Sequence, residues 1–169
     1  MNFEITSLHP NDSKNLENFI KHQSEDDLIF FSRWKNYDSS NVFKKIIFDE
    51  CNISPEIGVR IVAKNSSNEI IGFGLIDIFK EKNKKHVSIV GTIVDKKYRG
   101  LKIGKKLLEH EIQISKNNKK IKIRATAHEH NIASVKLHQS LGFSIEGKFV
   151  NEEFDTEYRN VLSLALFVN

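Results

Sequence analysis

Residues 94–108 read Val94-Asp95-Lys96-Lys97-Tyr98-Arg99-Gly100-Leu101-Lys102-Ile103-Gly104-Lys105-Lys106-Leu107-Leu108. An apolar, β-rich run from Val87 to Val94 stops here at a basic loop that contains glycine, and the loop opens directly into an amphipathic helix. The first N–H groups of a helix have no intrahelical partner, and the helix dipole adds partial positive charge at the same end. The stretch therefore predicts an anion site, with a phosphate or pyrophosphate as its natural ligand.

The composition is that of a soluble globular protein, with 39% apolar and 28% charged residues in a chain of 169, and we expect a single domain over residues 1–169. The net charge of +4 suits an anionic ligand, while the absence of an aromatic and basic stripe argues against nucleic acid. A single cysteine, Cys51, rules out an intramolecular disulfide and fits a reducing compartment. Residues 1–20 lack a signal-peptide pattern, and no apolar run approaches the roughly 20 residues of a membrane span. We therefore expect a cytoplasmic protein without a membrane partner.

Hydrophobic periodicity predicts an α/β fold in the order β-α-α-β-β-β-α-β-α-β-β. The predicted strands cover residues 3–6, 58–64, 69–79, 87–94, 120–127, 143–150 and 158–168. Helices are predicted to start near residues 13, 41, 103 and 131, where Asn, Asp or Ser residues or the basic loop give helix-start signals. This order predicts a mixed sheet with helices on its faces.

The basic loop does not match the common nucleotide motifs. A Walker A loop needs Gly-Lys-Ser/Thr, whereas Gly104 is followed by Lys105 and Lys106. A dinucleotide fingerprint needs three glycines, and the loop has two. The segment Gly72-Phe73-Gly74 lies inside a strand and predicts a bulge or a close-packing site.

The loop instead resembles the acyl-CoA motif of the GNAT N-acetyltransferase superfamily, usually Tyr-Arg-Gly-x-Gly-Ile-Gly-x-x-Leu-Leu. The matching residues here run from Tyr98 to Leu108, with Lys102 in place of the middle glycine. A side chain at this position either crowds the approach of a phosphate to the backbone or adds a cation beside it.

A second motif lies one helix and one strand further along the chain. Residues 131–143 read Asn131-Ile132-Ala133-Ser134-Val135-Lys136-Leu137-His138-Gln139-Ser140-Leu141-Gly142-Phe143 and resemble the family's Asn-x-x-Ala/Ser-x-x-Leu-Tyr-x-x-x-Gly-Phe segment. The Leu-His pair is most similar to the phosphinothricin and methionine-sulfoximine acetyltransferase branch. The resemblance covers residues 57–150 and implies a GNAT fold, with a mixed, largely antiparallel central sheet flanked by helices and splayed at the acyl-CoA strand.

The resemblance implies acetyl-CoA as cosubstrate and no metal. The strand residues Thr92, Ile93 and Val94 would expose backbone groups to the pantetheine arm, and a backbone N–H near Val94 would serve as oxyanion donor. Asn131, with Ser134, would hold either the pantetheine arm or the adenylate side of the cofactor. The pyrophosphate would lie on the backbone N–H groups of the loop and helix start, beside Arg99; the residues concerned are Gly100, Leu101, Lys102, Ile103, Gly104 and Lys105.

The catalytic groups are less regular than the cofactor motif. His138 stands where the family carries a Tyr that protonates the leaving thiolate, so the resemblance implies that His138 is the acid. The related branch has a Glu base on the strand before the loop, but residues 86–92 contain no carboxylate. His86, His128 and Glu129 remain as candidate bases, beside a water relay. His128, Glu129 and His130 lack further ligands at metal spacing, so no metal site is predicted.

The resemblance implies acetyl transfer to a primary amine by direct attack in a ternary complex. The Leu-His motif favours a small or amino-acid-like amine. Residues 24–34 faintly resemble the protein-lysine branch, which leaves a protein lysine or N-terminus as the alternative; Glu25, Asp26 and Asp27 in this segment either attract an amine or cap a helix.

Two further expectations concern the acceptor and the assembly. Glu152, Glu153 and Asp155, in a predicted loop before the last strand, are a second acidic candidate for attracting an amine. A sensor domain that binds acyl-CoA without turnover is a second alternative function. We expect a monomer or a homodimer.

Overall fold

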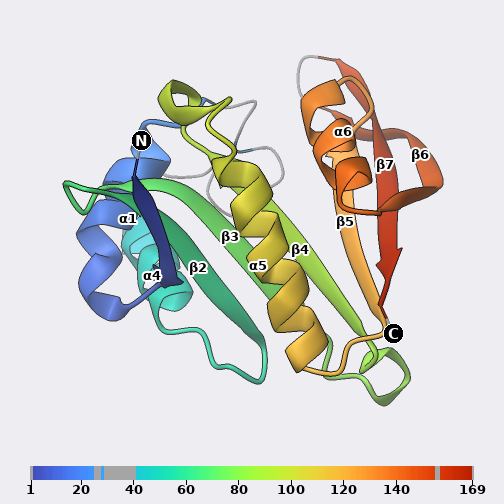
Figure 1. Ribbon diagram of the computed structural model, residues 1–169, viewed down its shortest axis with the longest axis horizontal. Helices are drawn as coiled ribbons and strands as arrows, with labels where there is room; N and C mark the ends of the chain where they lie inside the picture. The colour runs from blue at the N-terminus through green and yellow to red at the C-terminus, as the bar shows by residue number, and fades with distance from the viewer. Residues whose placement is uncertain (1, 25–27, 29–40, 155–156, 169) are drawn as a thin grey trace.

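The computed structural model describes residues 2–24, 28, 41–154 and 157–168. Its seven strands form one sheet in the order β1-β2-β3-β4-β5-β7-β6 (Figure 1). Only β4 and β5 pair in parallel, so the predicted mixed, largely antiparallel sheet is confirmed. No helix in these ranges is long and apolar enough to cross a membrane. The strands are β1 (Phe3–Ser7), β2 (Gly58–Asn65), β3 (Ile70–Ile78), β4 (Val87–Val94), β5 (Lys122–His128), β6 (Ser144–Phe154) and β7 (Tyr158–Phe167), and the helices are α1 (Ser13–Lys21), α4 (Asn41–Cys51), α5 (Ile103–Asn117) and α6 (Ile132–Ser140).

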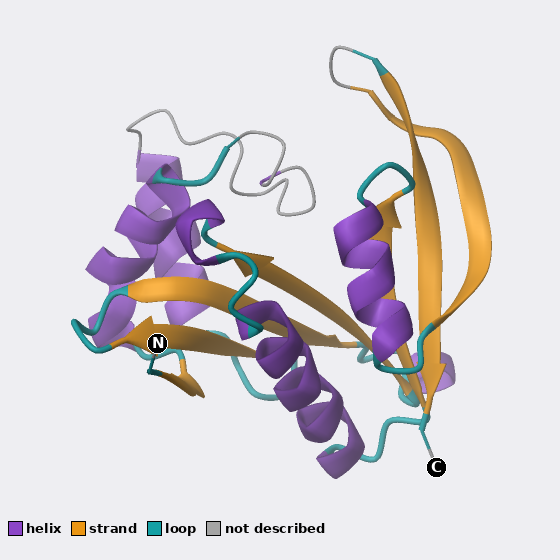
Figure 2. Ribbon diagram, turned by 45° about the horizontal axis from the view of Figure 1, so that its top comes forward, coloured by secondary structure: helices purple, strands orange, loops and turns teal. Residues whose placement is uncertain are grey.

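The sheet divides between β4 and β5. The two strands pair only from Val87–Lys122 to Ile89–Arg124, and beyond that point β4 stays with β3 while β5 stays with β7. Figure 2 shows the two halves of the sheet diverging. The predicted splay at the acyl-CoA strand is therefore confirmed, and it starts directly after Ile89.

Helices cover the sheet on both faces. On one face, α1 and α4 pack on β2, β3 and β4, where Leu16, Phe19 and Ile20 meet Phe73 and Leu75. On the other face, α5 covers the first half of the sheet and α6 the second. Side chains that alternate along β4 consequently face opposite sets of helices.

The last hairpin is longer than the sequence predicts. Residues 151–154 were expected to form a loop, but Glu152 and Glu153 lie in β6, and Glu153 pairs with Arg159 across the hairpin. A register shift between Phe149 and Glu153 absorbs extra residues, with Asn151 at φ +53° and its N–H donating to Asn160 Oδ1. Such a bulge lets a strand continue through a polar segment without a regular period-two pattern.

Helix α5 packs closely over the two glycines of β3. A Cβ on Gly72 would lie 2.9 Å from Leu107 Cδ1, and one on Gly74 would lie 2.3 Å from Glu111 Oε1. The close-packing interpretation of the Gly72-Phe73-Gly74 segment is therefore confirmed. The buried stripe of α5 consists of Ile103, Leu107 and Glu111. The carboxyl group of Glu111 is therefore fully buried beneath β4 (0% exposed).

We expect Gly74→Ala to destabilise the protein by about 1–3 kcal/mol, because the new methyl group would occupy the space of the Glu111 carboxyl. The control is Gly147→Ala, where a Cβ meets nothing within 4 Å. Urea denaturation measures both. A double variant Gly74→Ala/Glu111→Ala should recover much of the loss, and a purely additive effect would contradict this packing account.

Burial raises the pKa of Glu111 to about 8, since its only hydrogen-bond partner in the described residues is the Thr92 hydroxyl. The folded protein then holds a proton that the unfolded chain releases above pH 4.5. The free energy of unfolding should therefore fall as pH rises from about 4.5 to about 8, and level off above that range.

In Glu111→Gln this contribution is absent, so the stability difference between wild type and variant should change across the same pH window. Urea denaturation curves between pH 4.5 and 9 measure it, with Glu109→Gln, at a partly exposed carboxyl of the same helix, as control. A wild type and a Glu111→Gln variant with parallel pH profiles would contradict the buried acid.

Candidate active site

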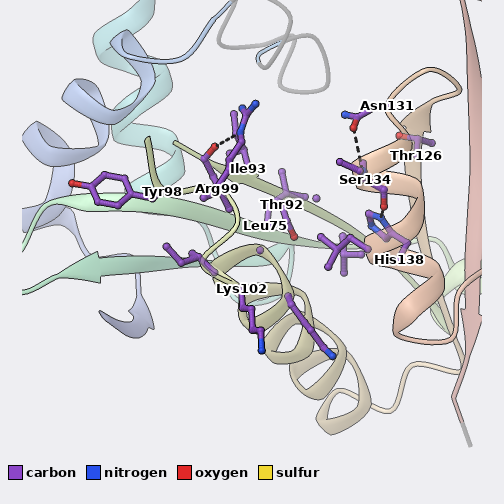
Figure 3. A pocket seen from close by; sticks show the side chains of 18 of the residues that line it. Leu75, Thr92, Ile93, Tyr98, Arg99, Lys102, Thr126, Asn131, Ser134 and His138 are labelled. Carbon is purple, nitrogen blue, oxygen red and sulfur yellow. Dashed lines mark hydrogen bonds between the residues drawn. The ribbon is translucent and has the colours of Figure 1, made fainter. Parts of the chain in front are cut away.

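A cavity of about 620 Å³ lies where β4 and β5 diverge (Figure 3). Its walls come from β4, the basic loop and the start of α5 on one side, and from β5 and α6 on the other. The structure thus brings together most of the predicted cofactor residues; those that line the cavity are Thr92, Ile93, Val94, Arg99, Gly100, Lys102, Ile103, Gly104, Lys105, Asn131 and Ser134. Leu101, which was also predicted, is exposed and does not line it.

The basic loop is a pair of tight turns that ends at the first residue of α5. Asp95 Oδ1 accepts the Lys97 N–H at 2.8 Å, and Gly100 has φ +79°. Lys102 precedes the helix with φ +64° and ψ +10°, in the left-handed region. Glycine enters this region freely, whereas another residue pays about 1–2 kcal/mol, which explains the family's glycine at this position. Lys102 adopts the same turn and keeps an exposed side chain at the cavity.

The start of α5 offers open hydrogen-bond donors to the cavity. The first intrahelical bond runs from the Lys106 N–H to the Lys102 carbonyl, and no side chain caps the helix. The N–H groups of Ile103, Gly104 and Lys105 therefore lie ahead of the helical hydrogen-bond ladder. Arg99 lies beside them and donates from Nε to the Val94 carbonyl at 3.2 Å. Open N–H groups and cations together fit an anionic ligand.

The cavity edge of β4 presents a second row of donors. The Asp95 N–H bonds to the Ile71 carbonyl, which makes Val94–Gly72 and Thr92–Gly74 non-hydrogen-bonded pairs of the β3–β4 ladder. The N–H groups of Thr92 and Val94 therefore face away from β3, toward the diverging β5. This supports the predicted exposure of backbone groups at Thr92 and Val94, whereas the backbone groups of Ile93 pair with Phe73 of β3.

Helix α6 forms the opposite wall. Asn131 caps it, with Oδ1 accepting the Ser134 N–H at 3.1 Å. The amide oxygen of Asn131 is therefore used inside the protein, and its Nδ2 is the group that a ligand would contact.

His138 projects from α6 into the cavity and is 4% exposed. Its Nδ1 lies 2.8 Å from the Ser134 carbonyl, and because a carbonyl only accepts, Nδ1 carries the proton. Its Nε2 is buried without a partner among the described residues, and Phe143 packs edge-on against the ring. Burial lowers the pKa of His138, so the resting ring is neutral and Nε2 is an acceptor.

The other candidate bases lie outside the cavity. His86 lies before β4 at the closed end of the splay, about 20 Å of extended chain from Thr92. His128 is buried and bonds through Nε2 to Glu153 at 2.9 Å. Glu129 accepts from Lys148 and Asn160, and these hydrogen bonds lower its pKa. Low basicity and a distant position both weigh against Glu129 as base.

Two predictions about the acceptor lie outside the described residues. The first concerns the 24–34 segment, most of which is not described, including the acidic residues Glu25, Asp26 and Asp27. The second concerns Asp155, which is not described either. Leu28 is described and is buried in the core under α1 and α4.

Within the described ranges, no three His, Cys, Asp or Glu side chains lie where they could hold a metal ion.

Glu111 and Tyr98 were not among the site residues predicted from the sequence. Tyr98 lines the cavity beside the loop, and Glu111 lies beneath it, bonded to Thr92. A signal for Glu111 was present, because it follows the buried positions Ile103 and Leu107 at intervals of four residues. A carboxyl group on the buried stripe of a helix is an exception that marks a special environment.

Solved structures with the same fold include several acetyltransferases. An N-acetyltransferase from Staphylococcus aureus Mu50 superposes with a TM-score of 0.81, at 20% identity, over 99% of each chain. A phosphinothricin acetyltransferase from Sinorhizobium meliloti in complex with AcCoA gives 0.80, at 16% identity, over 99% of this chain and 89% of that one. A putative acetyltransferase from Salmonella typhimurium with its cofactor acetyl-CoA gives 0.81, at 16% identity, over 100% and 95%.

The sequence itself matches a family model. No curated protein matches the chain significantly. The model of the acetyltransferase (GNAT) family matches residues 19–143, which include the basic loop, the Asn131–Phe143 motif and both walls of the cavity. The chain therefore belongs to the GNAT acetyltransferase family, whose acetyl donor is acetyl-CoA.

Proposed function

We propose that this protein transfers the acetyl group of acetyl-CoA to a small primary amine by direct attack in a ternary complex. The observation that carries the proposal is a single cavity that joins the open N-terminus of α5 to the His138 ring. Anion binding and proton transfer are then available in one space. The preference for a small acceptor over a peptide rests on the Leu137-His138 pair, which resembles that of the phosphinothricin acetyltransferase branch.

The described residues fit the cofactor. The N–H groups of Ile103, Gly104 and Lys105 would bind the pyrophosphate, with cations from Arg99 and Lys102 beside it. The cavity edge of β4 would bind the amides of the pantetheine arm, and Asn131 Nδ2 would contact it from α6. When bound, acetyl-CoA supplies a thioester that is activated toward attack by an amine.

The backbone N–H of Val94 is our proposed oxyanion donor. The β3–β4 register turns this group toward the cavity, and a rigid backbone donor needs no reorganisation during the reaction. The protein's main contribution would be to hold the thioester and the amine in line.

His138 is our proposed acid for the leaving thiolate. The acceptor ammonium loses one proton before attack, and the attacking nitrogen loses a second as the amide forms. The leaving thiolate gains one when the C–S bond breaks, so one proton is released to solvent overall. His138 Nε2 is the buried group at the cavity that can carry the proton for the thiolate. Its lowered pKa makes the imidazolium a strong donor, although the ring must first take up a proton. We propose a water relay as base, because His86, His128 and Glu129 lie outside the cavity.

Release of free thiol from acetyl-CoA, screened over amino acids, polyamines and peptides, tests the function. We expect a small amine to support turnover. Binding of acetyl-CoA without thiol release for any amine would instead indicate the sensor function, and turnover with peptides alone would indicate a protein acetyltransferase.

His138→Ala should lower kcat about 10²- to 10⁴-fold, the usual contribution of a general acid, while the Kd for acetyl-CoA changes much less. His110→Ala is the matched control, because His110 makes the same ring-to-carbonyl contact on an exposed surface of α5. His138→Tyr restores the family's usual acid and should recover part of kcat. Equal turnover in wild type and His138→Ala would remove the proposed role.

Variants of Lys102 test whether its side chain strengthens or weakens the binding of acetyl-CoA. Lys102→Gly should stabilise the fold by up to about 1 kcal/mol, since glycine enters the left-handed region without strain. Lys102→Ala keeps the strained backbone and removes the charge. If the cation assists binding, both variants should bind acetyl-CoA more weakly at low salt. Tighter binding by Lys102→Gly would show that the side chain crowds the phosphate.

A further inference from the structure

Glu111 and Thr92 form a hydrogen-bonded pair at the wall of the cavity, and neither the family motif nor the proposed chemistry accounts for it. The Thr92 Oγ1 atom lies 2.9 Å from Glu111 Oε1 and 3.1 Å from Oε2. Glu111 is fully buried, while Thr92 lines the cavity between Arg99 and His138 (Figure 3). Gly74 leaves the space that the carboxyl occupies. The pair therefore connects the buried side of α5 with the wall of the cofactor cavity.

The surroundings of the carboxyl are apolar. Ile61 of β2, Gly74 of β3 and Thr92 of β4 approach it, and none of them titrates. The charged residues of β2 and β3 project from the opposite face, where Arg60 pairs with Glu50 and Asp77, and Lys64 pairs with Asp12.

The neighbouring helices add no buried charge to the site. On α6, His138 is neutral at the cavity and Lys136 is exposed. The charged and titratable residues of α5 other than Glu111 are not buried, namely Lys105, Lys106, Glu109, His110 and Lys116. Among the described residues no cation pairs with Glu111. Such surroundings favour the neutral acid over the carboxylate.

We propose that Glu111 is a positioning residue for acetyl-CoA: as a neutral acid it donates its O–H to Thr92 Oγ1 and so directs the Thr92 hydroxyl proton to an acceptor atom of the pantetheine arm. This inference rests on the proposed function, since it assumes that the arm lies in the cavity. It assigns a role to the side chain of Thr92, in addition to that of its backbone.

The protonation state of Glu111 decides whether the Thr92 hydroxyl can donate a hydrogen bond to the ligand. A hydroxyl has one proton and two acceptor positions. When Glu111 is protonated, it fills one acceptor position of Thr92, and the Thr92 proton is available to the ligand. When Glu111 is ionised, it has no proton to give, and Thr92 must donate its own proton to the carboxylate. Ionisation of Glu111 therefore withdraws one hydrogen bond from the cofactor.

Three variants separate these states. Glu111→Gln keeps an N–H donor to Thr92 at every pH, so it should bind acetyl-CoA tightly from pH 6.5 to 9. Thr92→Val removes the hydroxyl, so it should bind about three- to tenfold more weakly at every pH, the loss of one neutral hydrogen bond. The wild type should match Glu111→Gln at pH 6.5 and approach Thr92→Val at pH 9. Thr92→Ser should restore the wild-type profile.

Isothermal titration with CoA and acetyl-CoA measures these dissociation constants without any acceptor. Ser115→Ala is the matched control, because it removes the buried hydrogen bond between α5 and Ser88 of β4 without touching the cavity. Affinities are compared with this control at each pH, so that titration of the cofactor phosphates and of the loop lysines cancels.

A Thr92→Val variant with the wild-type pH profile, or a Glu111→Gln variant that loses affinity like Thr92→Val, would overturn the inference. The first result would make the pair purely structural, and the second would show that the amide does not orient Thr92. Failure of the wild type to bind CoA at any pH would instead overturn the proposed function.

Discussion

Backbone hydrogen bonding between β4 and β5 ends after three residue pairs, and the cavity depends on this interruption. In a continuous sheet the N–H groups of Thr92 and Val94 would be paired with β5. Here they face the cavity and remain available as hydrogen-bond donors. Each strand keeps its other neighbour, so both halves of the sheet stay ordered while they diverge.

Helix α5 carries three different features of the structure. Its N-terminus offers open N–H groups, its buried stripe packs over Gly72 and Gly74, and the same stripe places Glu111 against Thr92. The close approach to the glycines fixes the height of the helix above the sheet. It thereby fixes where the open N–H groups of α5 lie relative to the edge of β4. Packing and ligand geometry are consequently set by the same contacts.

Three histidines illustrate how the environment assigns a role. His138 and His110 make the same bond from Nδ1 to the carbonyl four residues earlier on their helices. Only His138 is buried at the cavity with Nε2 unpartnered, and burial lowers its pKa. His128 is also buried, but Glu153 occupies its Nε2. Residue type alone therefore did not distinguish the candidates for proton transfer.

The sequence by itself determined the order of the elements, the basic loop that opens into α5 and the family, because each is written in local patterns: apolar periodicity, helix-start signals and glycine spacing. The extension of β6 escaped prediction because a bulge breaks the period-two pattern. The tertiary structure decided which side chains meet. The hydrogen bond from His128 to Glu153 and the burial of Glu111 against Thr92 depend on contacts between residues distant in the chain. The left-handed turn at Lys102 depends on backbone angles that composition does not encode. Long-range packing sets the pKa of a carboxyl, and no local pattern carries that information.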